Sequence, residues 1–317
     1  MRQKLTPLSE WARREDIPHS TARKMVAEGR IRAQKIGDRW YVVEDIPEEA
    51  VKGGMVLTLF IHAGGAGKTS LARDLGFELA SRGKRVLLVD MDPQANLSAW
   101  LGFEDVGERD TVLPVFEGAD LPPPKEVYPN LDLIPSHVEL ARGEVSLSRE
   151  PHNTFALRAA LNGLREKYDY ILVDSLPSLG SLAATAALAA DGLVVPVELS
   201  RKGVQALGTV IGVAEAYGKA LMRMRLWSGR SFVFLVVPTH AEGTARDREA
   251  LRLLQERLGD KVPVAPALSR RPAVYREAQT RGIPVQLVGS PEVVMELRGV
   301  ADLVESLVRK RLEEVGV

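Results

Sequence analysis

One stretch, Ile61–Ser70 (IHAGGAGKTS), has the residue types and the spacing of a phosphate-binding loop. It follows an apolar run and leads into a segment with helical character. Glycines let backbone N–H groups surround phosphate oxygens, and the start of a helix adds its positive end. Lys68 is predicted to reach the β- and γ-phosphates, and Thr69 to offer its hydroxyl to Mg²⁺. The residues predicted to bind ATP or ADP are Gly64, Gly65, Ala66, Gly67, Lys68, Thr69 and Ser70.

Three aspartates stand where two further apolar runs end. Asp90 and Asp92 follow one run within RVLLVDMDPQANLS, and Asp174 ends another within YDYILVDSLPSLG. An unpaired carboxylate at the end of a buried strand is costly, and a nearby Mg²⁺ would compensate its charge. Each feature alone has an ordinary explanation, such as a glycine-rich turn or a strand-end carboxylate. Together and in this order they favour a Mg²⁺-nucleotide site, with Thr69, Asp90 and Asp174 as the metal-binding residues.

The elements that must position these residues are visible after residue 54, where short apolar runs alternate with amphipathic helical stretches. Continuous apolar strands between helices indicate a parallel sheet covered on both faces. The predicted strands are Met55–Ile61, Arg85–Val89, Leu131–Ile134, Tyr170–Val173, Gly192–Val197 and Phe232–Val237. Gly102–Pro129 is the least regular stretch and is predicted to be rich in loops. The predicted fold class is α/β, a doubly wound, mostly parallel sheet of the P-loop type.

The first 43 residues differ from the rest in charge, because ten lysines and arginines face five acids while the whole chain is neutral. A helix capped by Thr6, a second helix capped by Ser20 and running to about Ala27, and two strands around Gly37-Asp38 are predicted. This layout resembles the winged helix-turn-helix domains of the excisionase and MerR type. The resemblance implies DNA contacts from the second helix and the wing. The predicted DNA-binding residues are His19, Thr21, Arg23, Lys24, Arg32, Lys35 and Arg39. A solvated basic face on a small protein-binding domain is the alternative.

Acids, a proline and paired glycines follow the basic segment without apolar periodicity, which is typical of a linker. The predicted boundaries are 1–47 for the winged helix-turn-helix domain, 48–54 for the linker and 55–317 for the nucleotide-binding domain. The chain has no cysteine, which excludes disulfides, iron–sulfur ligation and thiol catalysis. It also has no apolar stretch of the about 18 residues that a membrane helix needs, so the cytoplasm is the expected location.

The three nucleotide-site motifs resemble those of the ParA/MinD family. GGAGKTS matches the core of that family's deviant Walker A loop, DMDPQAN its switch I, and YILVDSLPS its Walker B strand and switch II. The resemblance spans about residues 55–312. It implies that Asp92 positions or activates the attacking water, so Lys68 and Asp92 are the predicted catalytic residues. Two positions depart from the pattern: Ala63 replaces the signature lysine, and Leu176 replaces the first proline of switch II.

The resemblance implies a homodimer that forms on ATP, a weak ATPase activity, and stimulation by a ParB-like centromere-binding protein. It also implies non-specific DNA binding away from the nucleotide, for which Arg246, Arg270 and Arg271 are the candidates, although Arg270 or Arg271 contacting adenine is an alternative. The predicted function is partition of a plasmid or chromosome by a cytoplasmic, nucleoid-associated ATPase. The N-terminal domain is expected to bind specific DNA and to autoregulate the operon.

Two other functions are compatible with the same motifs. The first is a nucleotide-gated transcriptional repressor without a partition role. The second is a MinD-like positioning ATPase, which would carry a membrane-binding helix at its C-terminus. The last predicted helix instead has an apolar stripe that is typical of packing against a protein core. Its members are Val293, Leu297, Val300, Val304 and Leu307. No membrane contact is therefore expected.

Overall fold

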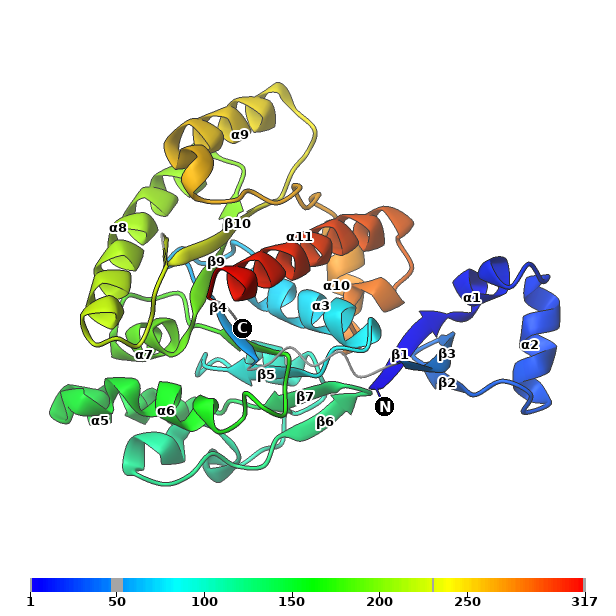
Figure 1. Ribbon diagram of the computed structural model, residues 1–317, viewed down its shortest axis with the longest axis horizontal. Coiled ribbons are helices and arrows are strands. Elements are labelled where there is room, and N and C mark those ends of the chain that lie inside the picture. Colours follow the sequence, from blue (N-terminus) through cyan, green and yellow to red (C-terminus); the bar gives the residue numbers. More distant parts are fainter. Residues whose placement is uncertain (1, 47–53, 230, 316–317) are drawn as a thin grey trace.

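Residues 2–46, 54–229 and 231–315 are described by the computed structural model shown in Figure 1. One sheet in it is built from β4 (Met55–Leu59), β5 (Val86–Asp90), β6 (Lys125–Tyr128), β7 (Leu131–Ile134), β8 (Tyr170–Asp174), β9 (Gly192–Glu198) and β10 (Val233–Thr239). The strand order is β10-β9-β4-β8-β5-β7-β6. Neighbours are parallel, except that β6 runs antiparallel to β7 at one edge.

All six predicted apolar runs form strands, which confirms the predicted parallel sheet. The central strands β4, β5 and β8 are buried at every position, because the sheet is covered on both faces. The edge strand β6 lies within the stretch that was predicted to be loop. Its sequence, KEVY, mixes charged and apolar residues, so it shows no continuous apolar run.

Helices cover the two faces of the sheet (Figure 1). They are α3 (Lys68–Ser81), α4 (Asn96–Ala99), α5 (Arg142–Arg149), α6 (Ala156–Asn162), α7 (Ser181–Ala189), α8 (Arg201–Arg223), α9 (Ala245–Leu258), α10 (Pro272–Thr280) and α11 (Pro291–Val315). Short 3₁₀ turns are η1 (Glu108–Asp110), η2 (Leu113–Glu117), η3 (Val138–Ala141), η4 (Pro151–Phe155), η5 (Gly259–Lys261) and η6 (Val285–Leu287).

Two apolar clusters lie on the opposite faces of the sheet. One joins strand residues such as Val56 and Ile171 to α6, α7 and α8. The other joins Leu57 and Leu172 to α3 and α11. The apolar stripe predicted on the last helix belongs to the second cluster, where Leu297 and most of its neighbours are fully buried. The stripe is therefore core, as predicted.

Residues 2–46 add a second, three-stranded antiparallel sheet with the order β1-β3-β2. We call residues 2–46 the N-terminal unit. Its elements are β1 (Arg2–Pro7), α1 (Leu8–Arg14), α2 (His19–Ala27), β2 (Ala33–Ile36) and β3 (Arg39–Ile46). The two predicted helices and the predicted hairpin are present. Gly29 and Gly37 both take positive φ, at 69° and 58°, as the turns that follow α2 and join β2 to β3 require.

Both predicted helix caps are wrong. Thr6 lies in β1, and its hydroxyl donates a hydrogen bond to Glu44 Oε2 at 2.5 Å. Ser20 is the second residue of α2 rather than its cap. Pro7 and Pro18 occupy the cap positions without a side-chain hydrogen bond, because the fixed φ of proline suits the entry into a helix. Strand β1 was not predicted, since it is defined by pairing with β3 rather than by an apolar pattern of its own.

The N-terminal unit divides its apolar residues between two cores. A small cluster of its own contains Leu8, Ala12, Ala22 and Val42. Leu5, Ile36 and Tyr41 instead belong to the cluster of α3 and α11. Residues 44–46 are part of β3, and residues 48–53 of the predicted linker lie outside the described residues. The division into domains at 47 and 55 therefore stays a prediction.

Candidate functional site

The phosphate-binding loop connects the end of β4 to the first residue of α3. Gly65 and Gly67 have φ values of 79° and 87°, which L-residues with a side chain rarely adopt. Thr239, at the end of β10, donates a hydrogen bond from Oγ1 to the carbonyl oxygen of Ala66 at 3.0 Å. This bond anchors the loop to the end of β10. The loop leads directly into the N-terminus of a 14-residue helix, so its backbone N–H groups and the positive end of the helix lie together.

Lys68 begins α3, and only 6% of its surface is exposed. Burial lowers the pKa of this ammonium group, whereas the carboxylates of Asp174 and Asp92 act in the opposite direction. A cation that is held among carboxylates and has lost most of its water interacts strongly with a multiply charged anion. The structure therefore brings together Lys68, Asp92 and Asp174, which were predicted from three separate motifs.

Asp90 ends β5, and Asp92 lies two residues beyond it in the segment that leads to α4. Asp90 is fully buried and accepts three hydrogen bonds, from the backbone N–H of Asp92 at 3.1 Å and from the N–H and Oγ of Ser98 at 3.0 and 2.7 Å. Burial nevertheless raises the pKa of Asp90 to about 6. Asp92 is partly exposed and accepts a hydrogen bond from the N–H of Gln94. Asp90 thus fixes the backbone that presents Asp92 to the site, while its direct role at a metal stays a prediction.

Asp174 lies opposite Asp90 on the neighbouring parallel strand. It is fully buried, and among the described residues neither of its carboxylate oxygens meets the geometry of a hydrogen bond. Burial and then the charge of Asp90 raise the pKa of Asp174 well above its usual range, while Thr69 and Lys68 act to lower it. Lys68 therefore compensates the buried charge of Asp174 only in part. The unpaired oxygens beside the Thr69 hydroxyl fit the oxygen ligands that Mg²⁺ prefers.

A cavity of about 1650 Å³ opens over the loop. It exceeds the roughly 300–1,000 Å³ of ordinary ligand pockets. The predicted residues in its wall are Gly64, Gly65, Gly67, Lys68, Thr69, Ser70, Asp92, Arg246, Arg270 and Arg271. Most of the residues predicted to bind the nucleotide and both predicted catalytic residues, Lys68 and Asp92, therefore line the same cavity.

The three arginines were expected to lie away from the nucleotide, but they line the same cavity as the phosphate-binding loop. Arg246 lines the cavity from the start of α9, and Arg270 and Arg271 line it from the segment before α10. Arg270 pairs with Glu242 at 2.6 Å and Arg271 with Glu292 at 2.5 Å. Their position agrees better with the alternative of a contact to the nucleotide, and DNA contact stays a prediction.

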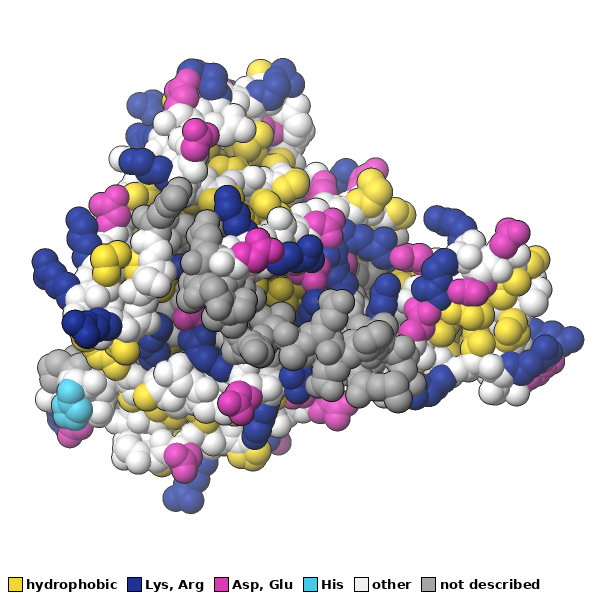
Figure 2. Space-filling view, in the orientation of Figure 1, with side chains coloured by type: hydrophobic (Ala, Val, Ile, Leu, Met, Phe, Trp, Pro, Cys, Tyr) yellow, Lys and Arg dark blue, Asp and Glu magenta, His cyan; other side chains and the backbone are white. Residues whose placement is uncertain are grey.

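The DNA-binding candidates of the N-terminal unit fall into two groups. The α2 residues His19, Thr21, Arg23 and Lys24 are all exposed, and α2 lies at the end of the unit that is distant from the large sheet (Figure 1). Figure 2 shows Lys and Arg side chains gathered at this outer end. Arg32 and Lys35 are exposed as well.

Arg39 differs from the other candidates because it turns toward the main body. Its Nη1 donates a hydrogen bond to the carbonyl oxygen of Gln286 at 3.4 Å. The predicted contact of Arg39 with DNA is thus in competition with a contact inside the chain.

Several residues of the cavity wall were not predicted. Thr239 ends β10, and Glu198 ends β9. Both could have been found from the rule that ligands of open parallel sheets bind at the carboxyl ends of the strands. Trp100 and Tyr275 also line the cavity. No motif marks them, because they reach it through the packing of α4 and α10.

The two departures from the family pattern lie beside the cavity. Ala63 is partly buried and packs against the main apolar cluster, and so does Leu176. Pro177, the proline that remains in switch II, lines the cavity. Ala63 brings no charge to the site.

Comparisons with known proteins agree with this geometry. Residues 54–223 match the AAA domain family. The chain is 48% identical over 296 residues to a probable plasmid-partitioning protein ParA of Thermus thermophilus, covering 92% of this chain and 90% of that protein. It is 34% identical over 171 residues to the sporulation initiation inhibitor protein Soj of Bacillus subtilis, covering 53% of this chain and 68% of Soj.

Among solved structures, a complex of Cyanothece McdA with ATP superposes with a TM-score of 0.70 at 26% identity, covering 80% of this chain and 97% of McdA. Within the described part of the chain, none of the helices is both long enough and apolar enough to span a membrane.

Proposed function

Because the chain belongs to the ParA/MinD family of P-loop ATPases, we propose that it is a DNA-partition ATPase that binds and hydrolyses ATP in the cavity over Gly64–Ser70. One observation carries the proposal. The phosphate-binding loop with its buried lysine and the partly exposed Asp92 line one cavity. The Asp174 carboxylate, which has no hydrogen-bond partner among the described residues, acts electrostatically on Lys68 from the buried end of β8. A high identity to a probable plasmid-partitioning ParA over nearly the whole chain supports the partition role.

In this function the backbone N–H groups of the loop bind the phosphate oxygens, and Lys68 neutralises the β- and γ-phosphates. Thr69 and Asp174 would hold Mg²⁺, directly or through water, and the bound ion would supply further positive charge for the phosphates. Asp92 orients the attacking water by accepting its hydrogen bond. Asp90 holds the backbone of Asp92 in place. Two features support a deviant Walker A loop: the GGAGK core, and His62 at the position where the common Walker A pattern has its first glycine.

The proposal includes an ATP-dependent homodimer, non-specific DNA binding and stimulation by a ParB-like partner. The family relationship supports all three. Ala63 removes the lysine that the family places at the dimer interface, so we propose that pairing and hydrolysis are weak without the partner.

A specific DNA contact through α2 and repression of the chain's own operon are supported by the element order of the N-terminal unit and its exposed basic α2. The same observations favour a second candidate, a nucleotide-gated repressor without a partition role. Two N-terminal units on a symmetric dimer would read an inverted repeat. A footprint confined to one operator, with no ATP-dependent binding of random DNA, would favour the repressor alone.

The decisive variant for hydrolysis is Asp92→Ala. We expect it to keep ATP affinity within about threefold and to lose turnover by about 100-fold or more, the usual contribution of a positioned acid–base group. Asp105→Ala, which removes an exposed aspartate outside the cavity wall, is the matched control. Turnover of Asp92→Ala at the rate of Asp105→Ala would disprove the water-orienting role.

A further inference from the structure

The N-terminal unit lies beside α3 (Figure 1), and its residues also contact η6 and α11. Leu5, Ile36 and Tyr41 are buried in the same cluster as the apolar residues of those elements. The rings of Tyr41 and Phe77 meet edge to face with centroids 6.4 Å apart. Because burial of apolar surface is the dominant favourable term in association, this contact holds the N-terminal unit against α3, η6 and α11.

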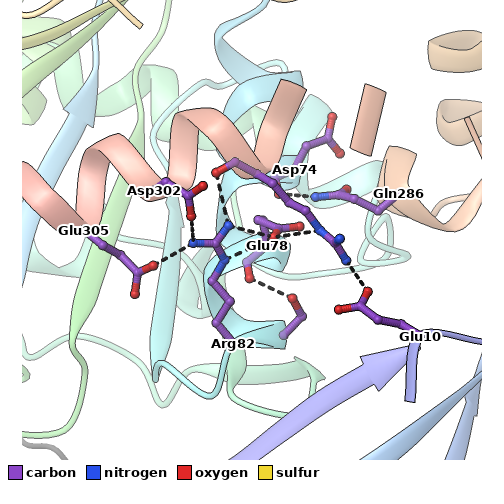
Figure 3. Close-up of polar contacts among 9 residues, drawn as sticks. Glu10, Asp74, Glu78, Arg82, Gln286, Asp302 and Glu305 are labelled. Atoms are coloured by element: carbon purple, nitrogen blue, oxygen red, sulfur yellow. Dashed lines mark hydrogen bonds and ion pairs between the residues drawn. The ribbon is translucent and has the colours of Figure 1, made fainter. Parts of the chain in front are cut away.

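Polar contacts surround this apolar centre and fix its orientation. Glu10 of α1 pairs with Arg298 of α11 at 2.7 Å, and Asp38 in the β2–β3 turn pairs with Arg281. Figure 3 shows Glu10 reaching toward the α3–α11 contact, where Arg82 binds Glu78, Asp302 and Glu305. Exposed ion pairs add little affinity but favour one geometry.

One contact of the interface continues into the interior. The Arg39 guanidinium lies over Gly289 and donates to the carbonyl oxygen of Gln286. The Gln286 side chain is buried, and its Nε2 donates to the carbonyl oxygen of Asp74 in α3 at 2.7 Å. The Asp74 carboxylate accepts from the N–H of Val285 at 3.0 Å. The segment under Arg39 is therefore bound twice to the helix that begins with the phosphate-binding lysine.

Asp74 connects this contact to the other side of the nucleotide cavity. Its carboxylate accepts from Nε and Nη2 of the fully buried Arg73, at 2.7 and 3.1 Å. The Arg73 guanidinium lies 5.6 Å from the centroid of the Trp100 ring. Trp100 directly follows α4, in the segment that carries Asp92, and both Asp74 and Trp100 line the cavity. A contiguous set of contacts thus runs from the N-terminal unit to the nucleotide cavity.

We propose that docking of the N-terminal unit on α3 and η6 is energetically coupled to nucleotide binding, with Arg39, Gln286 and Asp74 as the connecting residues. The docked unit holds η6 against α3, and so keeps the first turn of α3, with Lys68, in the position that binds phosphate. Coupling between two sites is reciprocal, so bound nucleotide stabilises the docked position by the same factor. The proposal rests on nucleotide binding at Lys68, as proposed above.

The test uses the full chain and Mg²⁺-ADP as the probe. The variant Arg39→Ala/Tyr41→Ala weakens the docking contact, and Arg13→Ala is the control, because Arg13 is an exposed cation of the same unit outside the interface contacts of the described residues. Isothermal titration gives ADP affinity. The rate of hydrogen exchange at the backbone amides of β1, β2 and β3 reports whether the N-terminal unit is docked. We expect the double variant to bind ADP about fivefold or more weakly, and ADP to slow β1–β3 exchange in the parent by a similar factor. Arg13→Ala should match the parent.

Two results would overturn the coupling. The first is unchanged ADP affinity in a double variant whose β1–β3 amides exchange faster. The second is unchanged exchange and unchanged affinity, which would show that these residues do not hold the unit. If the double variant fails to fold, Arg39→Ala alone replaces it, and loss of the ADP effect on exchange is then the expected result. A parent chain that binds no ADP would refute the proposed function itself, which separates the two failures.

A double-mutant cycle tests the route. Gln286→Ala removes the bond to Asp74 but leaves the backbone carbonyl that Arg39 contacts. If Gln286 transmits the effect, the losses of ADP affinity in Arg39→Ala and Gln286→Ala are not additive, since each breaks the same connection. Additive losses would show that the connection does not pass through Gln286.

Discussion

The hydrogen bond from Thr239 to the phosphate-binding loop gives a prediction whose size follows from the structure. Thr239→Val keeps the shape of the side chain and removes the donor to the Ala66 carbonyl, where both residues are buried. A buried acceptor left without its donor costs about 1–3 kcal/mol. Because Ala66 lies beside the open cavity, water can partly replace the donor, so we expect a loss of about 1–2 kcal/mol in the free energy of unfolding. A displaced loop should also weaken Mg²⁺-ADP binding.

Two other buried threonines provide matched controls. Thr58 donates to the carbonyl oxygen of Ala186 at 2.7 Å, away from the loop, so Thr58→Val should lose stability without losing ADP affinity. Thr185 is buried, and its Oγ1 has no hydrogen-bond partner among the described residues, so Thr185→Val should be neutral or slightly stabilising. Urea unfolding and ADP titration of the three variants make the test. If Thr239→Val behaves like Thr185→Val in both measurements, the bond does not hold the loop.

Two further predictions concern charge. The Arg14 guanidinium, with help from Thr6, holds the pKa of Glu44 below its usual value. The ionised Glu44 therefore stabilises the fold at neutral pH, and this contribution is lost as the pH falls through the lowered pKa. Glu44→Gln should consequently flatten the pH dependence of the free energy of unfolding below about pH 5. An unchanged acid limb in Glu44→Gln would contradict this assignment. The second prediction concerns DNA: Arg246, Arg270 and Arg271 are replaced together in the full chain, and binding to random duplex DNA is measured with ATP. We expect weaker binding, and a slope of log binding constant against log salt concentration that is smaller by about 0.9 per lost phosphate contact. An unchanged slope would show that these arginines serve the nucleotide cavity instead.

The sequence predicts most of the residues that the fold gathers at the candidate nucleotide site, because these residues lie in local motifs. The loop at Gly64–Ser70 and Asp92 follow buried apolar strands, and Asp174 ends another. Parallel strands bring their carboxyl ends to one edge of the sheet. The strand β6 and the caps of α1 and α2 are not predictable in the same way, because pairing and proline geometry decide them.

The interface of the N-terminal unit was missed for a related reason. Leu5, Ile36 and Tyr41 look like core residues of a small independent domain, and only tertiary packing assigns them to the cluster of α3 and α11. The orientation of Arg39 toward Gln286 is likewise invisible in a local charge count. Arg246, Arg270 and Arg271 follow no motif of spacing, so their position in the cavity wall could come only from the fold.

The most direct test of the central claim is the affinity of Lys68→Ala for Mg²⁺-ADP, measured beside the parent chain and Lys219→Ala, which removes an exposed lysine of α8. Lys68 is the buried cation of the loop, and charge-assisted hydrogen bonds of this kind contribute up to about 3 kcal/mol. We therefore predict an affinity loss of about 100-fold for Lys68→Ala and none for Lys219→Ala. Equal ADP affinity in all three proteins would contradict the assignment of the nucleotide site.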